Sequence, residues 1–161
     1  MATRFYIFAL LLFLLFPFGC GKNNSPTDTV KGIAEPINWT GSEKIYADFE
    51  GKKEYSMLMF YADWCGYCHK MDEVTFADPT VASTINEYFN AVRINAESDS
   101  LVVYMDTTAT GIEMGSIYDV SGYPTICFFD INGNLIARGL GYSNPSDFTR
   151  VLNMVLSGQL D

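Results

Sequence analysis

The stretch that decides the fold reads Tyr61-Ala62-Asp63-Trp64-Cys65-Gly66-Tyr67-Cys68-His69-Lys70-Met71. An apolar run, residues 57–61, leads directly into it, and a helical pattern of apolar residues follows. This arrangement predicts a buried strand over 55–62 and a helix over 65–76. Two cysteines, separated by two residues, therefore lie where the strand turns into the helix.

This position favours redox chemistry of the two sulfurs. The first turn of a helix presents unpaired N–H groups and the positive end of the backbone dipole, which stabilise an anion. The pKa of the Cys65 thiol is therefore expected below the ~8.5 of a free cysteine. Cys68 can reach back to Cys65, so we interpret Cys65 as the attacking sulfur and Cys68 as the resolving one. Trp64 is expected to cover one side of the pair and to keep bulk water away.

Two other chemistries use cysteines at this spacing. A zinc site needs further ligands, and the chain has no second CxxC and only one histidine, so we expect no metal. The run 65–69 also fits CxxCH, the attachment signature of c-type haem, with His69 as axial ligand. A dithiol needs no cofactor, and a purified protein without a Soret band would exclude the haem hypothesis.

Composition indicates one globular domain that does not bind nucleic acid. The chain has 161 residues, of which 48% are hydrophobic and 18% charged. A formal net charge of −9 leaves no excess of positive charge to follow a phosphate backbone. Four cysteines are too few for a disulfide scaffold. Cys127, among apolar neighbours, is predicted to be an inert core residue, with a second redox thiol as the alternative.

The N-terminus has the pattern of an export signal. Residues 1–19 combine a positive residue, Arg4, with an unbroken apolar run over 5–16, which is too short for the ~20 residues that span a bilayer. The end of this segment resembles a bacterial lipoprotein signal, in which Cys20 would be diacylated and become the mature N-terminus. Pro17 departs from the leucine usual at that position, and in the alternative Cys20 is a bystander. We expect a periplasmic or cell-envelope protein that is anchored to the membrane through its lipid.

A flexible linker over residues 20–37 and one domain over 38–161 are expected to follow. In that domain, helices are expected at 42–50, at 65–76 and at 145–157; a further helix is expected to begin at 79, and another to end at about 118. Strands are expected at 55–62, 89–95, 126–129 and 135–140. The segment 97–110 gives weaker indications. Residues 101–104 are compatible with an extra strand, and Thr108 or Thr110 with a helix cap.

Pro124 stands immediately before the apolar strand 126–129. Proline is poorly placed as an ordinary residue of a buried strand. The position is understandable if the Tyr123–Pro124 bond is cis, since the cis form costs an X-Pro bond only ~0.5–1 kcal/mol.

With these motifs in order, residues 38–158 resemble the thioredoxin superfamily. The resemblance implies an α/β protein with the thioredoxin fold: a central mixed sheet flanked by helices, with an extra N-terminal helix and an insertion before the cis-proline strand. Residues 61–68 and 74–79 look most like the C-terminal periplasmic domain of the transmembrane thiol:disulfide interchange reductase and related exported proteins. Tyr123 and Pro124 would then lie beside the cysteine pair, where Pro124 offers a substrate backbone a hydrogen bond.

Two departures from the family pattern concern proton transfer and redox potential. Thioredoxins carry a buried aspartate six residues before the first cysteine, where this chain has Met59. The proton relay is therefore expected to be either Asp72 or water. Gly66 and Tyr67 separate the cysteines where thioredoxin has Gly-Pro. This dipeptide tunes the potential, which spans roughly −270 to −120 mV in such proteins.

The sequence thus predicts an exported thiol:disulfide oxidoreductase with a Cys65–Cys68 redox disulfide. The resemblance implies the reducing direction, with protein or peptide disulfides as substrates and an upstream membrane electron donor. Three alternatives stay open: a dithiol oxidase on the same fold, a c-type haem carrier, and a non-catalytic thioredoxin-like binding lipoprotein.

Overall fold

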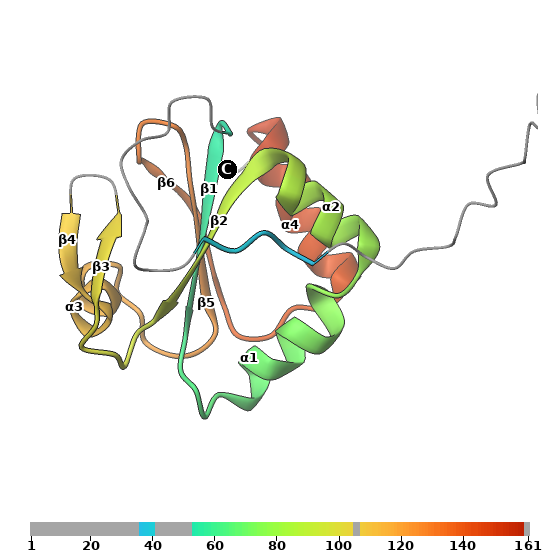
Figure 1. The fold of residues 1–161 in the computed structure, drawn as a ribbon. Helices are drawn as coiled ribbons and strands as arrows, with labels where there is room; N and C mark the ends of the chain where they lie inside the picture. Colours follow the sequence, from blue (N-terminus) through green and yellow to red (C-terminus); the bar gives the residue numbers. More distant parts are fainter. Residues whose placement is uncertain (1–35, 41–52, 105–106, 160–161) are drawn as a thin grey trace, which may run out of the picture. The chain divides into compact units, whose positions relative to one another are not determined.

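The structure is a computed structural model that describes residues 36–40, 53–104 and 107–159 (Figure 1). The expected signal peptide, Cys20, nearly all of the linker and the expected helix over 42–50 lie outside the described residues. Among the described helices, none has both the length and the apolar character needed to span a membrane.

The described elements follow one another as β1 (Tyr55–Tyr61), α1 (Gly66–Lys70), η2 (Met71–Thr75), α2 (Pro79–Tyr88), β2 (Phe89–Asn95), β3 (Leu101–Tyr104), β4 (Thr107–Thr110), α3 (Gly111–Ile117), β5 (Thr125–Phe129), β6 (Leu135–Leu140) and α4 (Pro145–Ser157). Four strands form one sheet in the order β2-β1-β5-β6. Strand β1 runs parallel to β2 and antiparallel to β5, which is antiparallel to β6. The expected mixed sheet in an α/β chain is therefore confirmed.

Helices cover both faces of this sheet (Figure 1). Helices α1, α2 and α4 lie on one face, and α3 lies on the other with the β3–β4 hairpin. Strand β1 is buried from both sides: Met57 and Met59 face the first layer, and Leu58 and Phe60 face the second. A strand that is apolar on both faces is what a sheet between two layers requires.

The segment 36–40 extends the sheet edge beside β2. Thr40 bridges Val92, and its N–H donates to the carbonyl of Ala91 at 2.8 Å. Ile37 is 8% exposed and belongs to the core on the α2 side. The packed part of the chain therefore includes Ile37, the last residue assigned above to the linker.

The weakly predicted segment 97–110 contains the insertion before the cis-proline strand. Strands β3 and β4 pair as an antiparallel hairpin outside the main sheet. Thr110, one of the two candidate caps, begins α3: its hydroxyl accepts from the Glu113 N–H, and the Glu113 carboxylate accepts from the Thr110 N–H. This reciprocal pair is a capping box, which satisfies two N–H groups that the helix itself cannot.

The helix after the cysteines differs from the expected uniform α-helix. It begins as α1 and continues as a π-helical turn, η2, over Met71–Thr75. The wider turn buries both Met71 and Thr75 against the loop before α4. There the Thr75 hydroxyl donates to the carbonyl of Ser143 at 2.6 Å, and the Ser143 N–H donates to the Met71 sulfur at 3.4 Å. These contacts hold the cysteine-bearing helix against the loop between β6 and α4.

Candidate active site

The two cysteines meet at the start of α1. Cys65 is the N-cap residue, and it forms a disulfide with Cys68 whose Cα atoms are 5.2 Å apart. The N–H of Cys68 donates to the Cys65 sulfur at 3.1 Å. An N–H group directed at this sulfur stabilises it as a thiolate, which is the form that attacks disulfides. Both cysteines are nearly buried, with Cys65 4% and Cys68 1% exposed.

Trp64 forms one flank of the pair together with the cis-proline loop. Its indole N–H donates to the Glu97 carboxylate at 2.8 Å, and its ring lies edge-on to Tyr123 at 5.8 Å. The Tyr123–Pro124 bond is cis, as expected. Trp64 is 71% exposed, so much of its ring is open to solvent and available to a docked polypeptide.

Tyr67 forms the other flank. It is 62% exposed and stacks on Tyr142, which follows β6, with ring centroids 6.4 Å apart. The Lys70 ammonium lies 4.2 Å from the centre of the Tyr142 ring. A Cβ added at Gly66 would meet no atom within 4 Å, so the surface between these flanks is open at that residue. Exposed aromatic rings beside a buried pair of sulfurs provide a surface on which a polypeptide can bind.

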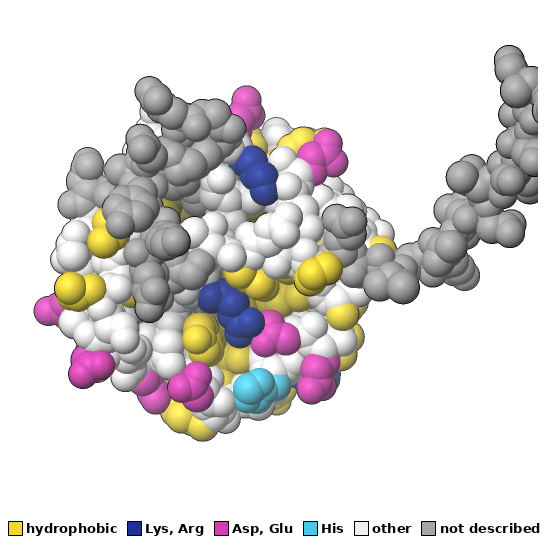
Figure 2. All heavy atoms as spheres, viewed as in Figure 1, with side chains coloured by type: hydrophobic (Ala, Val, Ile, Leu, Met, Phe, Trp, Pro, Cys, Tyr) yellow, Lys and Arg dark blue, Asp and Glu magenta, His cyan; other side chains and the backbone are white. Residues whose placement is uncertain are grey.

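The charge around this surface is uneven. Figure 2 shows hydrophobic and acidic side chains next to one another at the end of the molecule where α1 begins. Burial, and secondly the charge of Glu97, raise the pKa of Tyr123. The phenol beside the cis-proline is therefore neutral at physiological pH, and Glu97 places negative charge on the Trp64 flank.

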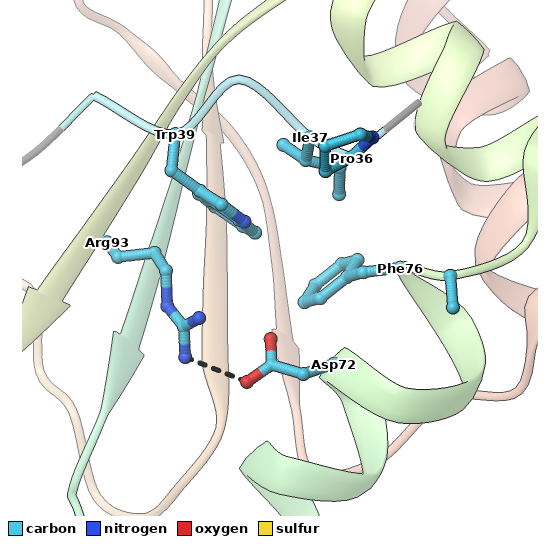
Figure 3. Close-up of a pocket in the computed structure, with 7 residues that line it drawn as sticks. Pro36, Ile37, Trp39, Asp72, Phe76 and Arg93 are labelled. Atoms are coloured by element: carbon cyan, nitrogen blue, oxygen red, sulfur yellow. Dashed lines mark hydrogen bonds and ion pairs between the residues drawn. The ribbon is translucent and has the colours of Figure 1, made fainter. Parts of the chain in front are cut away.

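Asp72, the proposed proton relay, is directed towards Arg93 (Figure 3). The Arg93 guanidinium donates to the Asp72 carboxylate at 3.0 Å and lies 4.7 Å from the centre of the Tyr61 ring. Both charged residues line a cavity of about 610 Å³ whose other walls include Trp39 and Phe76. Asp72 is one-third exposed, so water reaches this ion pair.

Met59 and His69 bear on the proton relay and on the haem hypothesis, respectively. The position six residues before Cys65 is occupied by Met59, which is fully buried in the core and carries no carboxylate. The His69 ring nitrogen Nε2 lies 3.0 Å from the carbonyl oxygen of Asp63. In the part of the chain that the structure describes, no three His, Cys, Asp or Glu side chains gather as metal ligands would.

Cys127 is expected to resist alkylation in the native protein. It is fully buried in β5, and burial raises the pKa of its thiol, although contact with Arg138 acts in the opposite direction. A protonated, enclosed thiol reacts slowly. Treating the reduced full chain with iodoacetamide, followed by mass mapping, should label Cys65 and leave Cys127 unmodified until denaturant is added. Native labelling of Cys127 at the rate of Cys65 would identify it as a second reactive thiol.

Sequence reasoning missed three residues that shape this site. Glu97, Arg93 and Tyr142 contact Trp64, Asp72 and Tyr67 respectively, from positions 21 to 75 residues away in the chain. Of the three, only Arg93 could have been noticed in the sequence, because it is the single charged residue of strand β2.

Comparisons with known proteins agree with this geometry. A family model described as a thioredoxin-like domain matches residues 43–156. The thiol:disulfide interchange protein DsbD of Yersinia pestis is 31% identical over 138 residues, which cover 81% of this chain and 21% of that protein. The chain thus spans about a fifth of the length of the curated relatives it matches.

Two solved structures share the fold. A thioredoxin-fold protein from Helicobacter pylori superposes with a TM-score of 0.63 at 20% identity, over 80% of this chain and 79% of that one. A thioredoxin from Thermus thermophilus superposes with a TM-score of 0.59 at 23% identity, over 76% and 88% of the two chains. At these identities the similarity establishes the thioredoxin fold.

Proposed function

Because this chain belongs to the thioredoxin-like domain family, we propose that it is an exported thiol:disulfide oxidoreductase that reduces protein or peptide disulfides through Cys65 and Cys68. The observation that carries this proposal is the Cys68 N–H directed at the Cys65 sulfur, at the N-terminus of α1 and between two exposed aromatic flanks. The name of the Yersinia relative, a thiol:disulfide interchange protein, supports the same chemistry.

The reaction proceeds in two exchanges. The Cys65 thiolate attacks one sulfur of the substrate disulfide, so that a Cys65–substrate bond forms, the substrate S–S bond breaks, and the leaving thiolate takes a proton from water. Cys68 then loses its proton and attacks the Cys65 sulfur, which releases the second substrate thiol. Two electrons have passed to the substrate, and the protein holds the Cys65–Cys68 disulfide until an upstream membrane donor reduces it.

The substrate would lie across the exposed end of the molecule. Trp64 and Tyr67 bind it on either side of the cysteines, with Gly66 leaving the space between them open. Tyr123 and the backbone of Pro124 align the substrate chain during the mixed disulfide. Cys65 is the slightly more exposed residue of the pair, 4% against 1%, which supports its assignment as the cysteine that a substrate reaches first.

The N-terminal sequence supports a place at the cell envelope. We propose that residues 1–19 direct export, that diacylated Cys20 anchors the protein, and that residues 20–37 tether the domain of residues 38–161. Membrane attachment would hold the domain close to both its electron donor and exported substrates. Release of the protein from membranes by replacing Cys20 with serine would support the lipid anchor.

The reduction potential of the Cys65/Cys68 couple is the decisive test of direction. Equilibration of the full chain with glutathione buffers should give a value below about −150 mV for a reductant, and a higher value for a dithiol oxidase. The reduced protein should also reduce insulin disulfides. No exchange at all would favour the non-catalytic binding protein, and a Soret band in the purified protein would favour the haem carrier.

Asp72→Asn is expected to slow the second exchange about tenfold near neutral pH, because the amide cannot accept the proton of Cys68. Asp72 follows Cys68 by four residues, about one helical turn. Acid quenching and mass spectrometry would follow the lifetime of the mixed disulfide as a function of pH. Glu73→Gln, which removes an equal charge from the neighbouring residue, is the matched control. Equal effects of the two substitutions would assign the proton to water.

A further inference from the structure

A second cavity lies on the α3 side of the active site. It measures about 450 Å³ and runs between the end of β2, helix α3 and the loop before the cis-proline. Ala96 and Gly115 form its buried floor, and Val120 is half-buried in its wall. The exposed residues Asp119 and Ser121 stand on its rim.

This cavity is continuous with the surface around the disulfide. Tyr123 lines it and at the same time packs edge-on against Trp64 at 5.8 Å. The next residue is the cis-proline, Pro124. A polypeptide whose cysteine reacts at Cys65 and whose backbone follows the cis-proline loop would pass Tyr123, which is part of the lining of this cavity.

The lining defines the side chain that fits. The floor is small and apolar, and it is kept shallow by Gly115, where an added Cβ would lie 3.3 Å from the Ala96 Cβ. At the rim, the Asp119 carboxylate forms no ion pair within the described residues, and none of the Lys or Arg side chains they contain lines the cavity. A trough with a small apolar floor, polar walls and an unpaired carboxylate at its rim matches the aliphatic stem and charged head of lysine or arginine.

The backbone holds Asp119 in this place. Helix α3 ends at Ile117, and the Asp119 N–H donates to the carbonyl of Ser116 at 3.2 Å. Asp119 has a φ of 55°, a left-handed conformation that aspartate and asparagine tolerate better than most residues. The other acid of this flank, Glu97, is already engaged with the Trp64 indole. Asp119 is thus the carboxylate that is available to a substrate.

We propose that this cavity is a specificity subsite that receives a lysine or arginine side chain close to the reacting cysteine of a polypeptide substrate. The inference rests on the proposed function and narrows its substrate class to basic polypeptide segments. Asp119 is the specificity-determining residue, and Trp64 and Tyr123 connect its subsite to the disulfide.

Three short peptides test the subsite. They carry one cysteine, differ only in having Arg, Met or Glu on both sides of it, and are each presented as the mixed disulfide with 2-nitro-5-thiobenzoate. The rate constant for exchange with the reduced full chain should be about fivefold higher for the Arg peptide than for the Met peptide. The Glu peptide should be the slowest, and added salt should reduce the differences.

Asp119→Asn should bring the ratio of the Arg and Met rate constants close to one. The asparagine keeps the shape and the left-handed backbone, so folding is preserved. Glu87→Gln on α2 is the matched control, since it removes the same charge from an exposed position that does not line the cavity, and the ratio should stay at its wild-type value.

Equal wild-type rates for the Arg and Met peptides, or an unchanged ratio in Asp119→Asn, would overturn the subsite while the proposed function stands. A ratio that falls equally in Glu87→Gln also overturns it, because net charge would then explain the preference. Failure of all three peptides to react overturns the proposed function itself, so the two kinds of failure are distinguishable.

Discussion

Replacing Cys65 by serine is expected to lower the rate of disulfide exchange by roughly a thousandfold or more, because the reaction loses its nucleophile. A serine hydroxyl in the same place does not ionise near neutral pH, and the Cys68 N–H then has no thiolate to stabilise. Insulin reduction under a constant supply of dithiothreitol measures the loss. Retention of wild-type activity by Cys65→Ser would show that the attacking sulfur has been assigned wrongly.

Cys68→Ser should give a different defect, and the contrast identifies the two roles. Cys65 can still attack, but nothing resolves the mixed disulfide, so a covalent protein–substrate adduct accumulates. Non-reducing electrophoresis and mass spectrometry would detect it. Cys127→Ala serves as the control, since Cys127 lies buried in β5 and the substitution should leave exchange intact. Adducts that form through Cys68 in the Cys65→Ser protein would reverse the assignment.

The structure places Cys65 and Cys68 where the sequence predicts them, at a strand-to-helix junction, because this arrangement is local. Cys65 and Cys68 lie within one turn, and the strand before them and the helix after them each follow from a short apolar pattern. Thr110 and Asn144 cap α3 and α4 as their residue types suggest. Such features depend on interactions between residues three or four positions apart, which a single sequence displays directly.

The other features of the site depend on contacts between parts of the chain that are distant in sequence. Nothing near Trp64 in the sequence indicates that Glu97 will accept its indole N–H. Likewise, the ion pair of Asp72 depends on Arg93, which β2 brings into register with Met59 of β1. The π-helical turn also follows from tertiary contacts, because Ser143 holds both Met71 and Thr75. The sequence shows these residues, but their partners are visible only in the fold.

Gly111 at the start of α3 occupies a position where intrinsic propensity and packing oppose each other. Alanine is favoured over glycine in a helix by up to ~1 kcal/mol, so propensity alone predicts that Gly111→Ala stabilises the protein. In the structure, however, an added Cβ would lie far inside van der Waals contact with the Asn95 carbonyl oxygen and 3.0 Å from that of Ser98. The clash is with backbone atoms, which have no alternative rotamer.

The backbone around Gly111 has little freedom to relieve this clash. The Gly111 N–H donates to Ser100 and the Ile112 N–H donates to Ser98, both at 3.1 Å, so helix and loop cannot separate without losing hydrogen bonds. Gly111→Ala is therefore expected to lower the free energy of unfolding by about 3 kcal/mol. It should also displace the loop that carries Glu97, and so weaken the support of Trp64.

Gly139→Ala is the matched control for Gly111→Ala. Gly139 lies in β6 with no atom within 4 Å of an added Cβ, so its replacement should change the free energy of unfolding by less than about 1 kcal/mol. Urea denaturation followed by circular dichroism would compare the two variants. If Gly111→Ala unfolds at the same urea concentration as Gly139→Ala, then α3 is not held against the end of β2 as described. The cavity beside Asp119 depends on that packing, because α3 and Ala96 line it. The Glu97–Trp64 contact depends on it as well, because Glu97 lies between Asn95 and Ser98, the residues against which Gly111 packs.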